Sequence, residues 1–471
     1  HRQQQGLENL KQKLAGAGQQ ALDEGRPAEA VQYFQKALAA QPRNPALLTW
    51  LGSAYLLQGA LPEAERTLKE AASLDPRSAV VQNNLGNVYL AQGRLTEAEK
   101  AYLAALKLNP QSFDANYNLA NLYQRLGKDE KSWVYYTAAL KLNPDDAEAH
   151  ISFGLAMQRI GEVQKAIREY EAARRLKPGN VRLLNTLGLL YTKIKRHAEA
   201  RDRYEEALKY DGASADAHAG LGIALYHLGQ VDEAERQLRQ AQTLDPANAA
   251  ARDNIGLILV ARGDLAGAEA IYRAALARKF DDPVTLHNLG SVLLKQERAG
   301  EAVELLRKAV QLNPQLAEAH LNLAVALEKT GAGEAALAQW REGVRRCPGD
   351  PDLYQGLGRA LAERLLLDEA LAAYLRSLEL RENNPAVHNA VGLIYLQRAS
   401  LVSAASHFRA AVKYNPAYAE AYNNLGVVLE RQGKREEARQ QYRRALEVDA
   451  QCVPARENLE RLNATAEKGA G

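Results

Sequence analysis

Apolar, small and polar positions repeat along this chain with a spacing that fits pairs of amphipathic helices. In residues 83–110 a first apolar stripe contains Leu85 and Tyr89, and a second contains Ala98 and Tyr102. A separation of four residues places each pair on one face of an α-helix. A single hairpin of two such helices cannot bury both stripes, so it needs copies of itself on either side.

The chain supplies those copies as 13 consecutive units of 34 residues, numbered here as repeats 1 to 13 with positions 1 to 34. Gly93 lies where the turn between the helices favours a positive φ, and Pro110 ends the second helix. We expect a polar lead-in at residues 1–10, the repeats at 11–452, and a capping helix with a frayed tail at 453–471.

Two positions in each unit predict how the helices pack. Position 8 is always small, and position 24 is usually aromatic, as in Tyr102 and Tyr136. We interpret position 8 as the point where the two helices of a hairpin cross closely. After the last repeat, Glu460 occupies this position, so the final helix cannot accept another hairpin. The turn glycine at position 15 is replaced in four repeats, by Lys195, Glu297, Leu365 and Ala399.

This unit resembles the tetratricopeptide repeat, which has Leu-Gly, Tyr, Ala, an aromatic residue and Pro in this order over 34 residues. The resemblance covers 442 of the 471 residues. It implies an all-α fold, a right-handed α-solenoid superhelix of 13 helical hairpins plus a C-terminal capping helix. It also implies a concave groove that holds segments of other proteins.

In this family positions 2, 5, 6, 9, 12 and 13 of each first helix line the groove. The candidate partner-binding residues at these positions are Trp50, Asn83, Asn84, Asn87, Tyr117, Asn118, Asn121, Arg125, Asn254, Asn288, Asn322 and Asn424. An amide offers a donor and an acceptor, which match the peptide bond of an extended ligand. The asparagines resemble those in the repeat region of O-linked N-acetylglucosamine transferases. The alternatives are that the amides are solvated consensus residues, and that Trp50 packs against the neighbouring repeat.

Other chemistries find little support. His150, His218, His320 and His388 all fall at position 4, two or three repeats apart, so they cannot converge on one zinc ion. We therefore expect no metal site and no cofactor. No phosphate loop or nucleophile elbow is present, and every stretch long enough for a catalytic domain is already a repeat. Position 5 of the early repeats has no lysine, which argues against the carboxylate clamp that some family members use for chaperone tails.

Charge and composition limit the classes of partner that the chain is expected to bind. With 60 Lys and Arg against 57 Asp and Glu, the net charge of +3 is too small to indicate nucleic acid. We expect Cys347 and Cys452 to be free thiols, because 105 residues separate them. No apolar run approaches the roughly 18 residues of a membrane span. The chain begins at His1 rather than Met, which suggests that a segment has been removed and leaves open a cytoplasmic or a bacterial periplasmic location.

These observations favour a non-enzymatic scaffold or adaptor that holds partner proteins or peptides, with assembly of a multiprotein complex as its expected role. Two alternatives stay open. The chain could recruit substrates for a larger enzyme such as a glycosyltransferase, or it could serve envelope or secretion machinery as an exported bacterial scaffold. Self-association is also compatible with the sequence.

Overall fold

The computed structural model describes residues 2–278 and 281–467. Within these ranges the chain forms 27 α-helices and no strand, so the predicted all-α fold is confirmed. The helices belong to two compact units, His1–Asn248 and Ala249–Gly471, and the division falls between repeats 7 and 8. Each unit is described by itself.

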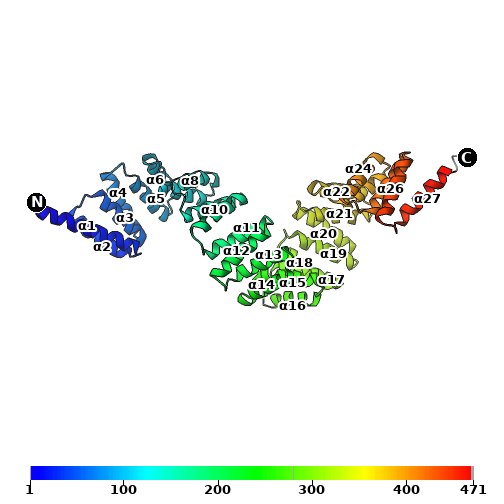
Figure 1. Ribbon diagram of the computed structural model, residues 1–471, viewed down its shortest axis with the longest axis horizontal. Coiled ribbons are helices and arrows are strands. Elements are labelled where there is room, and N and C mark those ends of the chain that lie inside the picture. The colour runs from blue at the N-terminus through cyan, green and yellow to red at the C-terminus, as the bar shows by residue number, and fades with distance from the viewer. Residues whose placement is uncertain (1, 279–280, 468–471) are drawn as a thin grey trace. The chain divides into compact units, whose positions relative to one another are not determined.

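Unit 1 contains seven hairpins, coloured blue to green in Figure 1. Its helices are α1 (Arg2–Asp23), α2 (Pro27–Ala40), α3 (Pro45–Gln58), α4 (Leu61–Leu74), α5 (Ala79–Ala91), α6 (Leu95–Leu108), α7 (Phe113–Arg125), α8 (Asp129–Leu142), α9 (Ala147–Arg159), α10 (Val163–Leu176), α11 (Val181–Lys193), α12 (His197–Tyr210), α13 (Ala215–His227) and α14 (Val231–Leu244).

Unit 2 contains six hairpins and one further helix, coloured green to red in Figure 1. Its helices are α15 (Ala249–Ala261), α16 (Leu265–Ala277), α17 (Pro283–Lys295), α18 (Ala299–Leu312), α19 (Ala317–Lys329), α20 (Gly333–Arg346), α21 (Pro351–Ala362), α22 (Leu367–Leu380), α23 (Pro385–Gln397), α24 (Leu401–Tyr414), α25 (Ala419–Arg431), α26 (Arg435–Val448) and α27 (Val453–Glu467).

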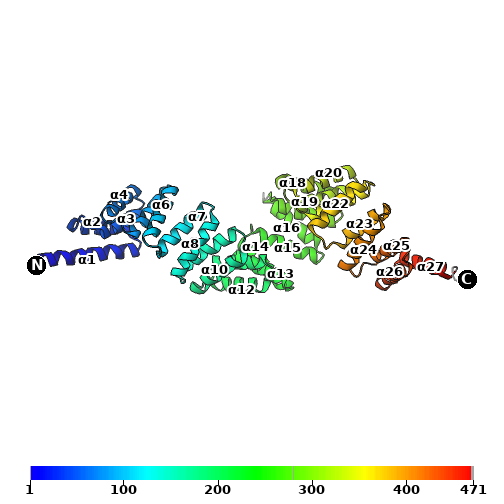
Figure 2. The ribbon, with the colours of Figure 1, turned by 90° about the horizontal axis from the view of Figure 1, so that it is seen from above.

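Within each unit, an odd-numbered helix is the first helix of a repeat and packs against the even-numbered helix that follows it. The even-numbered helix also packs against the first helix of the next repeat, as Figure 2 shows for α2 and α3. First helices of neighbouring repeats also touch in many pairs, among them α5 with α7 and α11 with α13. Each hairpin therefore buries its second apolar stripe on its neighbour, as the sequence pattern requires.

Most first helices begin with a side-chain cap at position 34 of the preceding repeat. Ser78, Ser112 and Asp146 each accept a hydrogen bond from the backbone N–H three residues further on. Such a cap satisfies one of the N–H groups that the first turn leaves without a partner. The second helices mostly start without one, Asp264 on Gly267 being an exception.

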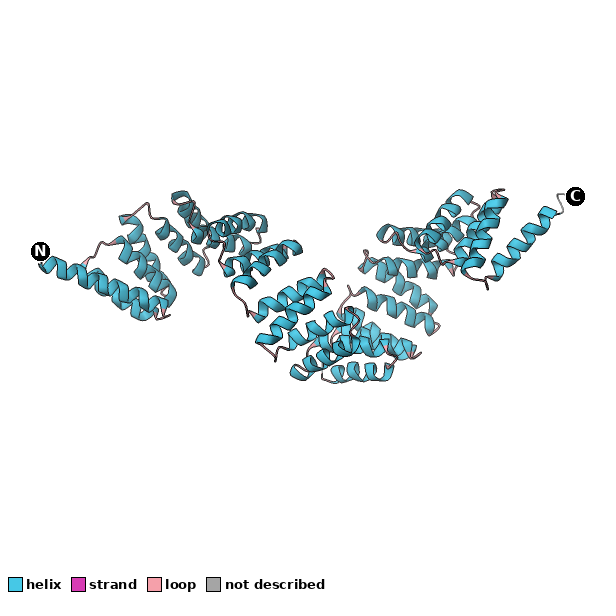
Figure 3. Cartoon of the chain, viewed as in Figure 1, coloured by secondary structure: helices cyan, strands magenta, loops and turns pink. Residues whose placement is uncertain are grey.

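The turns within the hairpins are short (Figure 3), and position 15 adopts a left-handed conformation in them whether or not it is glycine. Gly93 has φ of 76°. The four substituted positions, Lys195, Glu297, Leu365 and Ala399, have φ between 58° and 63°. Residues with a Cβ atom are strained in this region, so these turns are held by the packing of the helices on both sides.

The small residue at position 8 lies against the side chain at position 24 of its own repeat. A Cβ atom on Gly86 would come within 2.5 Å of the Tyr102 ring. Position 8 is therefore small because a large side chain covers it; at Gly222 the backbone oxygen of Ala234 on the second helix also lies 3.0 Å from where a Cβ would be, as expected for a close helix crossing. The same side chain can also reach position 6 of the next repeat, where a Cβ on Gly356 would lie 2.3 Å from Trp340.

Helix α27 covers the last hairpin. Leu462 is buried against the core of α24–α26, and Arg461 pairs with Glu430 of α25 at 2.6 Å. Glu460, at the position that is small elsewhere, is exposed. Among the described residues no helix combines the length and the apolar character needed to cross a bilayer.

Candidate binding faces of the repeat units

The groove face is defined here as positions 2, 5, 6, 9, 12 and 13 of the first helices. Its most regular feature is a hydrogen bond that joins position 5 of one repeat to position 6 of the next, 35 residues later. We call each such bond an inter-repeat rung. Rungs occur in both units, and both units also have stretches without them; in unit 1 these are α1, α3 and α5 as well as α9, α11 and α13.

In unit 1 the rungs join α5, α7 and α9. The amide nitrogen of Asn118 donates to Oδ1 of Asn83 at 3.0 Å, and the Tyr117 hydroxyl lies 3.1 Å from Oγ of Ser152. Asn83 is only 7% exposed, so Asn118 satisfies a buried acceptor. These polar side chains stabilise the contact between neighbouring repeats.

In unit 2 the rungs lie at both ends. The amide nitrogen of Asn424 donates to Asn389 at 3.0 Å, and that of Asn458 donates to Asn423 at 3.0 Å. At the other end Asn288 hydrogen-bonds Asp253, and Nδ2 of Asn322 lies 3.4 Å from Nδ1 of His287. Burial raises the pKa of Asp253, and the contacts with Arg252 and Asn288 oppose that rise.

The remaining candidate amides also have internal partners. Asn84 donates to Oγ of Ser53 at 3.0 Å, and Asn254 donates to the carbonyl oxygen of Ala250 at 2.8 Å. Asn87 accepts the hydroxyl of Tyr102 at 2.7 Å, and Asn121 accepts that of Tyr136 at 2.5 Å.

Three other candidates differ in what they leave accessible. The partly exposed ring of Trp50 lies 6.0 Å from that of Phe34, so it packs against the neighbouring repeat. Tyr117 stacks on Phe113 with a ring separation of 5.8 Å. Arg125 is exposed, and no carboxylate among the described residues pairs with it. That these residues and the amides contact a partner stays a prediction; six of the nine candidate asparagines donate one hydrogen bond within the chain, and the other three accept one.

The rungs stop in unit 1 between α9, α11 and α13. Ile151 cannot hydrogen-bond Thr186, and the residue that would follow Asn185 is Gly220. A Cβ on Gly220 would lie 2.2 Å from the ring of Tyr204, which occupies that space. Oδ1 of Asn185 is consequently buried without a hydrogen-bond partner among the described residues.

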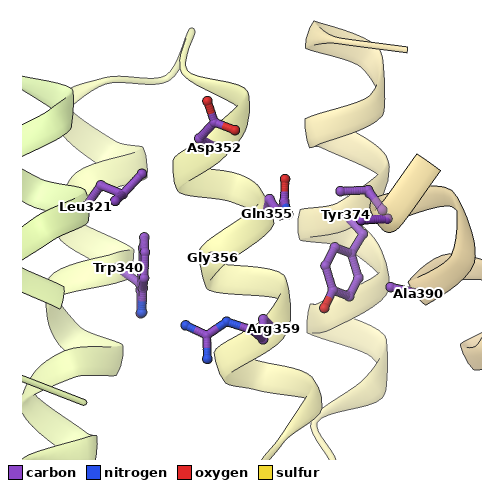
Figure 4. Close-up of a pocket in the computed structure, with 10 residues that line it drawn as sticks. Leu321, Trp340, Asp352, Gln355, Gly356, Arg359, Tyr374 and Ala390 are labelled. Carbon is purple, nitrogen blue, oxygen red and sulfur yellow. The ribbon is translucent and has the colours of Figure 1, made fainter. Parts of the chain in front are cut away.

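The rungs also stop in unit 2 between α19, α21 and α23, and a pocket of about 380 Å³ lies there (Figure 4). Position 6 holds only Gly356 and Ala390 in these repeats, and the rings of Trp340 and Tyr374 form walls of the pocket. The full lining is Leu321, Trp340, Asp352, Gln355, Gly356, Arg359, Tyr374, Ala386, Val387 and Ala390. The missing amides thus leave a mainly apolar hollow in the groove face.

The charged residues of this pocket are fixed by neighbours. Arg359 pairs with Glu328 at 2.7 Å and with Glu363 at 2.9 Å. Glu328 also accepts the indole N–H of Trp340 at 2.8 Å, which holds the ring in place. Asp352, on the same helix as Arg359 in Figure 4, pairs with Arg381. The rings of Trp340 and Tyr374 are only 2% and 6% exposed, so the pocket offers a ligand little ring surface, together with a cation and a carboxylate on one helix.

The position-4 histidines connect repeats and are not isolated rings. Nε2 of His388 lies 3.0 Å from the carbonyl oxygen of Glu382, which can only accept, so Nε2 carries hydrogen. Nδ1 of His388 then accepts from Nδ1 of His407 at 3.0 Å. Burial lowers the pKa of both residues. In unit 1, a hydrogen bond to Glu169 raises the pKa of His150.

Neither thiol is in a disulfide, which confirms the prediction for Cys347 and Cys452. Across the described ranges, no group of three or more His, Cys, Asp or Glu side chains is arranged to hold a metal ion. The groove face consequently offers hydrogen bonds, apolar surface and fixed charges as its means of recognition.

The inter-repeat rungs and the pocket were missed by sequence reasoning. A usable signal for the rungs exists, because a polar residue at position 5 is followed 35 residues later by Asn at position 6 in several repeats. The pocket had a weaker signal, the replacement of that Asn by Gly356 and Ala390 in successive repeats.

Comparison with known proteins shows which family this chain resembles. The profile described as cilia and flagella-associated protein 70 C-terminal domain matches residues 4–182 and again 159–355, and a tetratricopeptide repeat profile matches 390–452. No curated protein matches the chain. Solved structures with similarity include the APC/C hetero-tetramer Cut9-Hcn1 at 16% identity (89% of this chain, 96% of that chain, TM-score 0.45). Yeast Tom70 is 16% identical (90% and 96%, TM-score 0.43), and pilF of Pseudomonas aeruginosa is 20% identical (45% and 96%, TM-score 0.40).

The profile matches include a domain of tetratricopeptide repeats over three quarters of the chain and the repeat itself near the C-terminus. They agree with the hairpins, the covered small residue at position 8 and the left-handed turn at position 15. The chain therefore belongs to the tetratricopeptide-repeat family.

Proposed function

We propose that this protein is a non-enzymatic scaffold that binds segments of partner proteins on its groove faces, at the stretches where inter-repeat rungs are missing. The pocket between α19, α21 and α23 carries this proposal, because it combines an apolar hollow with two aromatic walls. Pockets of this kind take one anchoring side chain of a peptide. Assembly of a multiprotein complex would follow if both units bind at once.

The distribution of the rungs also supports this proposal. Where they are present, polar groups of the groove face bond each other and stabilise the stack of repeats. Where they are absent, apolar atoms are left open to a ligand. A partner segment gains most from covering apolar surface, since groups that are already hydrogen-bonded would have to give up an internal partner.

The test is selection of peptides from a displayed random library on the purified chain, followed by measurement of their affinities. Ala390→Phe places a ring inside the pocket, and Ala386→Trp fills its mouth from an exposed position. Val402→Phe is the matched control, because Val402 is 80% exposed and does not line the pocket.

We expect the selected peptides to bind the parent chain and the control equally. Both pocket variants should weaken binding by about tenfold or more, as for loss of an anchor site, with unchanged helicity by circular dichroism. Failure to select any peptide, or equal binding to all variants, would contradict the proposal.

A further inference from the structure

The stretch of unit 1 without rungs carries a row of aliphatic side chains. Position 9 of repeats 5, 6 and 7 holds Leu155, Leu189 and Ile223, and we call these residues the aliphatic row. Leu155 is 47% exposed and Leu189 is 60% exposed, while Ile223 is partly exposed. All three lie on the groove face of consecutive first helices, α9, α11 and α13.

The same position is polar in the earlier repeats of this unit. It holds Gln19, Ser53, Asn87 and Asn121. Asn87 and Asn121 accept tyrosine hydroxyl groups, so in those repeats position 9 serves the internal network. The leucines accept no hydrogen bond, and their exposed atoms are available for apolar contact.

A row of cations runs beside the aliphatic row. Position 13, one helical turn beyond position 9, holds Arg125, Arg159 and Lys193 in repeats 4, 5 and 6. Arg159 donates to the carbonyl oxygen of Gln124 at 2.8 Å and lies 3.7 Å from a carboxylate of Asp129. Arg125 and Lys193 form no ion pair with any residue that the structure describes.

The acidic side chains of this face lie apart from the cations. On α7, α9 and α13 they are Asp114, Glu148 and Asp216, at position 2 of their helices. Positions 2 and 13 are 11 residues apart, which is about 16 Å along a helix. The end of the face next to the aliphatic row is therefore cationic, and it complements an acidic ligand.

The spacing of the row favours a helical occupant. Packed helices lie about 8–10 Å apart, so adjacent side chains of the row recur at about that interval. Seven residues of an α-helix advance about 10.5 Å and return to nearly the same face. Three residues of a strand advance about 10 Å, but the third side chain points to the opposite face. A helix with an aliphatic residue at every seventh position therefore matches the row.

We propose that the groove face of α7, α9, α11 and α13 binds an acidic amphipathic helix of a partner protein. Its aliphatic side chains contact Leu155, Leu189 and Ile223, and its carboxylates pair with Arg125, Arg159 and Lys193. This inference rests on the proposed scaffold function and specifies the class of partner for unit 1.

The test uses a synthetic helical peptide of about 18 residues, which spans about 27 Å. The peptide has Leu at every seventh position and on the adjacent turn, with Glu on the flanking positions. A second peptide replaces each Glu by Lys, and a third keeps the composition but scrambles the order. Binding to the full chain is measured by fluorescence anisotropy at two salt concentrations.

Two variants and one control locate the site. Leu155→Gln with Leu189→Gln removes the aliphatic row at exposed positions, so folding should be unaffected. Arg125→Glu with Lys193→Glu reverses the charge of the cationic row. Val134→Gln is the matched control, because Val134 on α8 is 63% exposed and lies outside the groove face.

We expect the acidic peptide to bind the parent chain and the control, more weakly at high salt. The leucine variant should lose about tenfold in affinity, and the charge-reversed variant should prefer the lysine peptide. Equal binding of the acidic and scrambled peptides would overturn the inference, and so would equal binding to the leucine variant and the control. Concentration-dependent self-association that the leucine variant abolishes would overturn it too, because the occupant would then be a second copy of this chain.

If no helical peptide binds while library peptides still bind the unit 2 pocket, this inference fails and the proposed function stands. If peptides bind neither unit, both fail.

Discussion

In unit 1 the face of α5 and α7 differs from that of α9, α11 and α13, although both come from the same 34-residue pattern. The first has amides that bond one another from repeat to repeat. The second has leucines, a glycine and a buried amide oxygen without a partner among the described residues. The comparison teaches that the family pattern sets the packing of the hairpins, while a few groove positions decide whether a face is used for cohesion or left open.

Unit 2 makes the same contrast with different residues. Rungs join α15, α17 and α19 and again α23, α25 and α27, and the pocket lies between them. The breaks at α9, α11 and α13 of unit 1 and at α19, α21 and α23 of unit 2 coincide with open apolar surface.

The largest effect on stability is expected from introducing an asparagine at position 6 where an aromatic ring occupies the space. Gly356→Asn puts a Cβ 2.3 Å from Trp340, so the ring must move, and we expect a loss of about 3 kcal/mol in the free energy of unfolding. Ala390→Asn is the matched control, because this position already carries a Cβ; it should change stability by less than about 1 kcal/mol. Urea unfolding followed by circular dichroism measures both. Equal losses of stability in the two variants would show that the Trp340 ring is not the reason why the rung is missing.

Removing a rung should cost less. Asn118→Ala leaves the buried Oδ1 of Asn83 without its donor, and we expect a loss of about 1–3 kcal/mol. Asn254→Ala removes an amide that bonds only the backbone of its own helix, and should cost about 0.5 kcal/mol or less. If the two variants unfold at the same urea concentration, the rungs do not stabilise the contacts between repeats.

Lowering the pH should weaken the histidine contacts and leave the rungs between asparagines unchanged, because imidazole groups bind protons in this range and amides do not. The folded pKa values of His388 and His407 are lowered by burial, so the unfolded chain binds more protons as the pH falls through about 6.5. Stability of unit 2 should therefore fall from pH 7 to pH 5. His407→Gln should reduce this slope, as hydrogen exchange of α23 and α24 would show.

In unit 1 the pKa of one histidine is raised, so its contribution to stability changes with pH in the opposite direction. The pKa of His150 is raised by Glu169, so its contribution is present below about pH 6.5 and is lost as the pH rises through the higher folded value. Replacing Glu169 by Gln should remove that contribution at low pH only. A pH-independent effect of the substitution would contradict the assignment of a charged imidazole.

The smallest effect concerns a turn that belongs to neither kind of face. Leu365 is 76% exposed with φ of 62°, so Leu365→Gly should relieve strain and raise stability by up to about 1 kcal/mol. Leu366→Gly, at the next residue, whose φ is −81°, should lower it. No gain for the first variant, measured by the same urea titration, would show that the turn is not strained.

The sequence predicted the hairpins because helix period, turn glycine and the pair of small and large residues are local signals. Glu460 likewise predicted a helix that ends the array. The nature of the contact at Gly86 was not predictable, since sequence alone does not say whether a backbone or a ring covers a glycine.

The candidate site was predictable only in part. The asparagines were predicted, but several of their partners lie 35 residues away, so a pattern within one repeat could not show that these amides are bonded within the chain. Leu155 and Leu189 were not predicted as binding residues, because an apolar side chain at position 9 does not show from sequence alone whether it is exposed. The pocket exists because Gly356 and Ala390 have little or no side chain, and a missing side chain is a weak signal in a sequence.

Hydrogen–deuterium exchange of the full chain with a library-selected peptide shows whether partner segments bind where the rungs are missing. We expect the peptide to slow exchange in helices that border a break in the rungs, namely α19, α21 and α23 or α9, α11 and α13. Protection confined to α7, α17 and α25, which have rungs on both sides, would contradict this expectation.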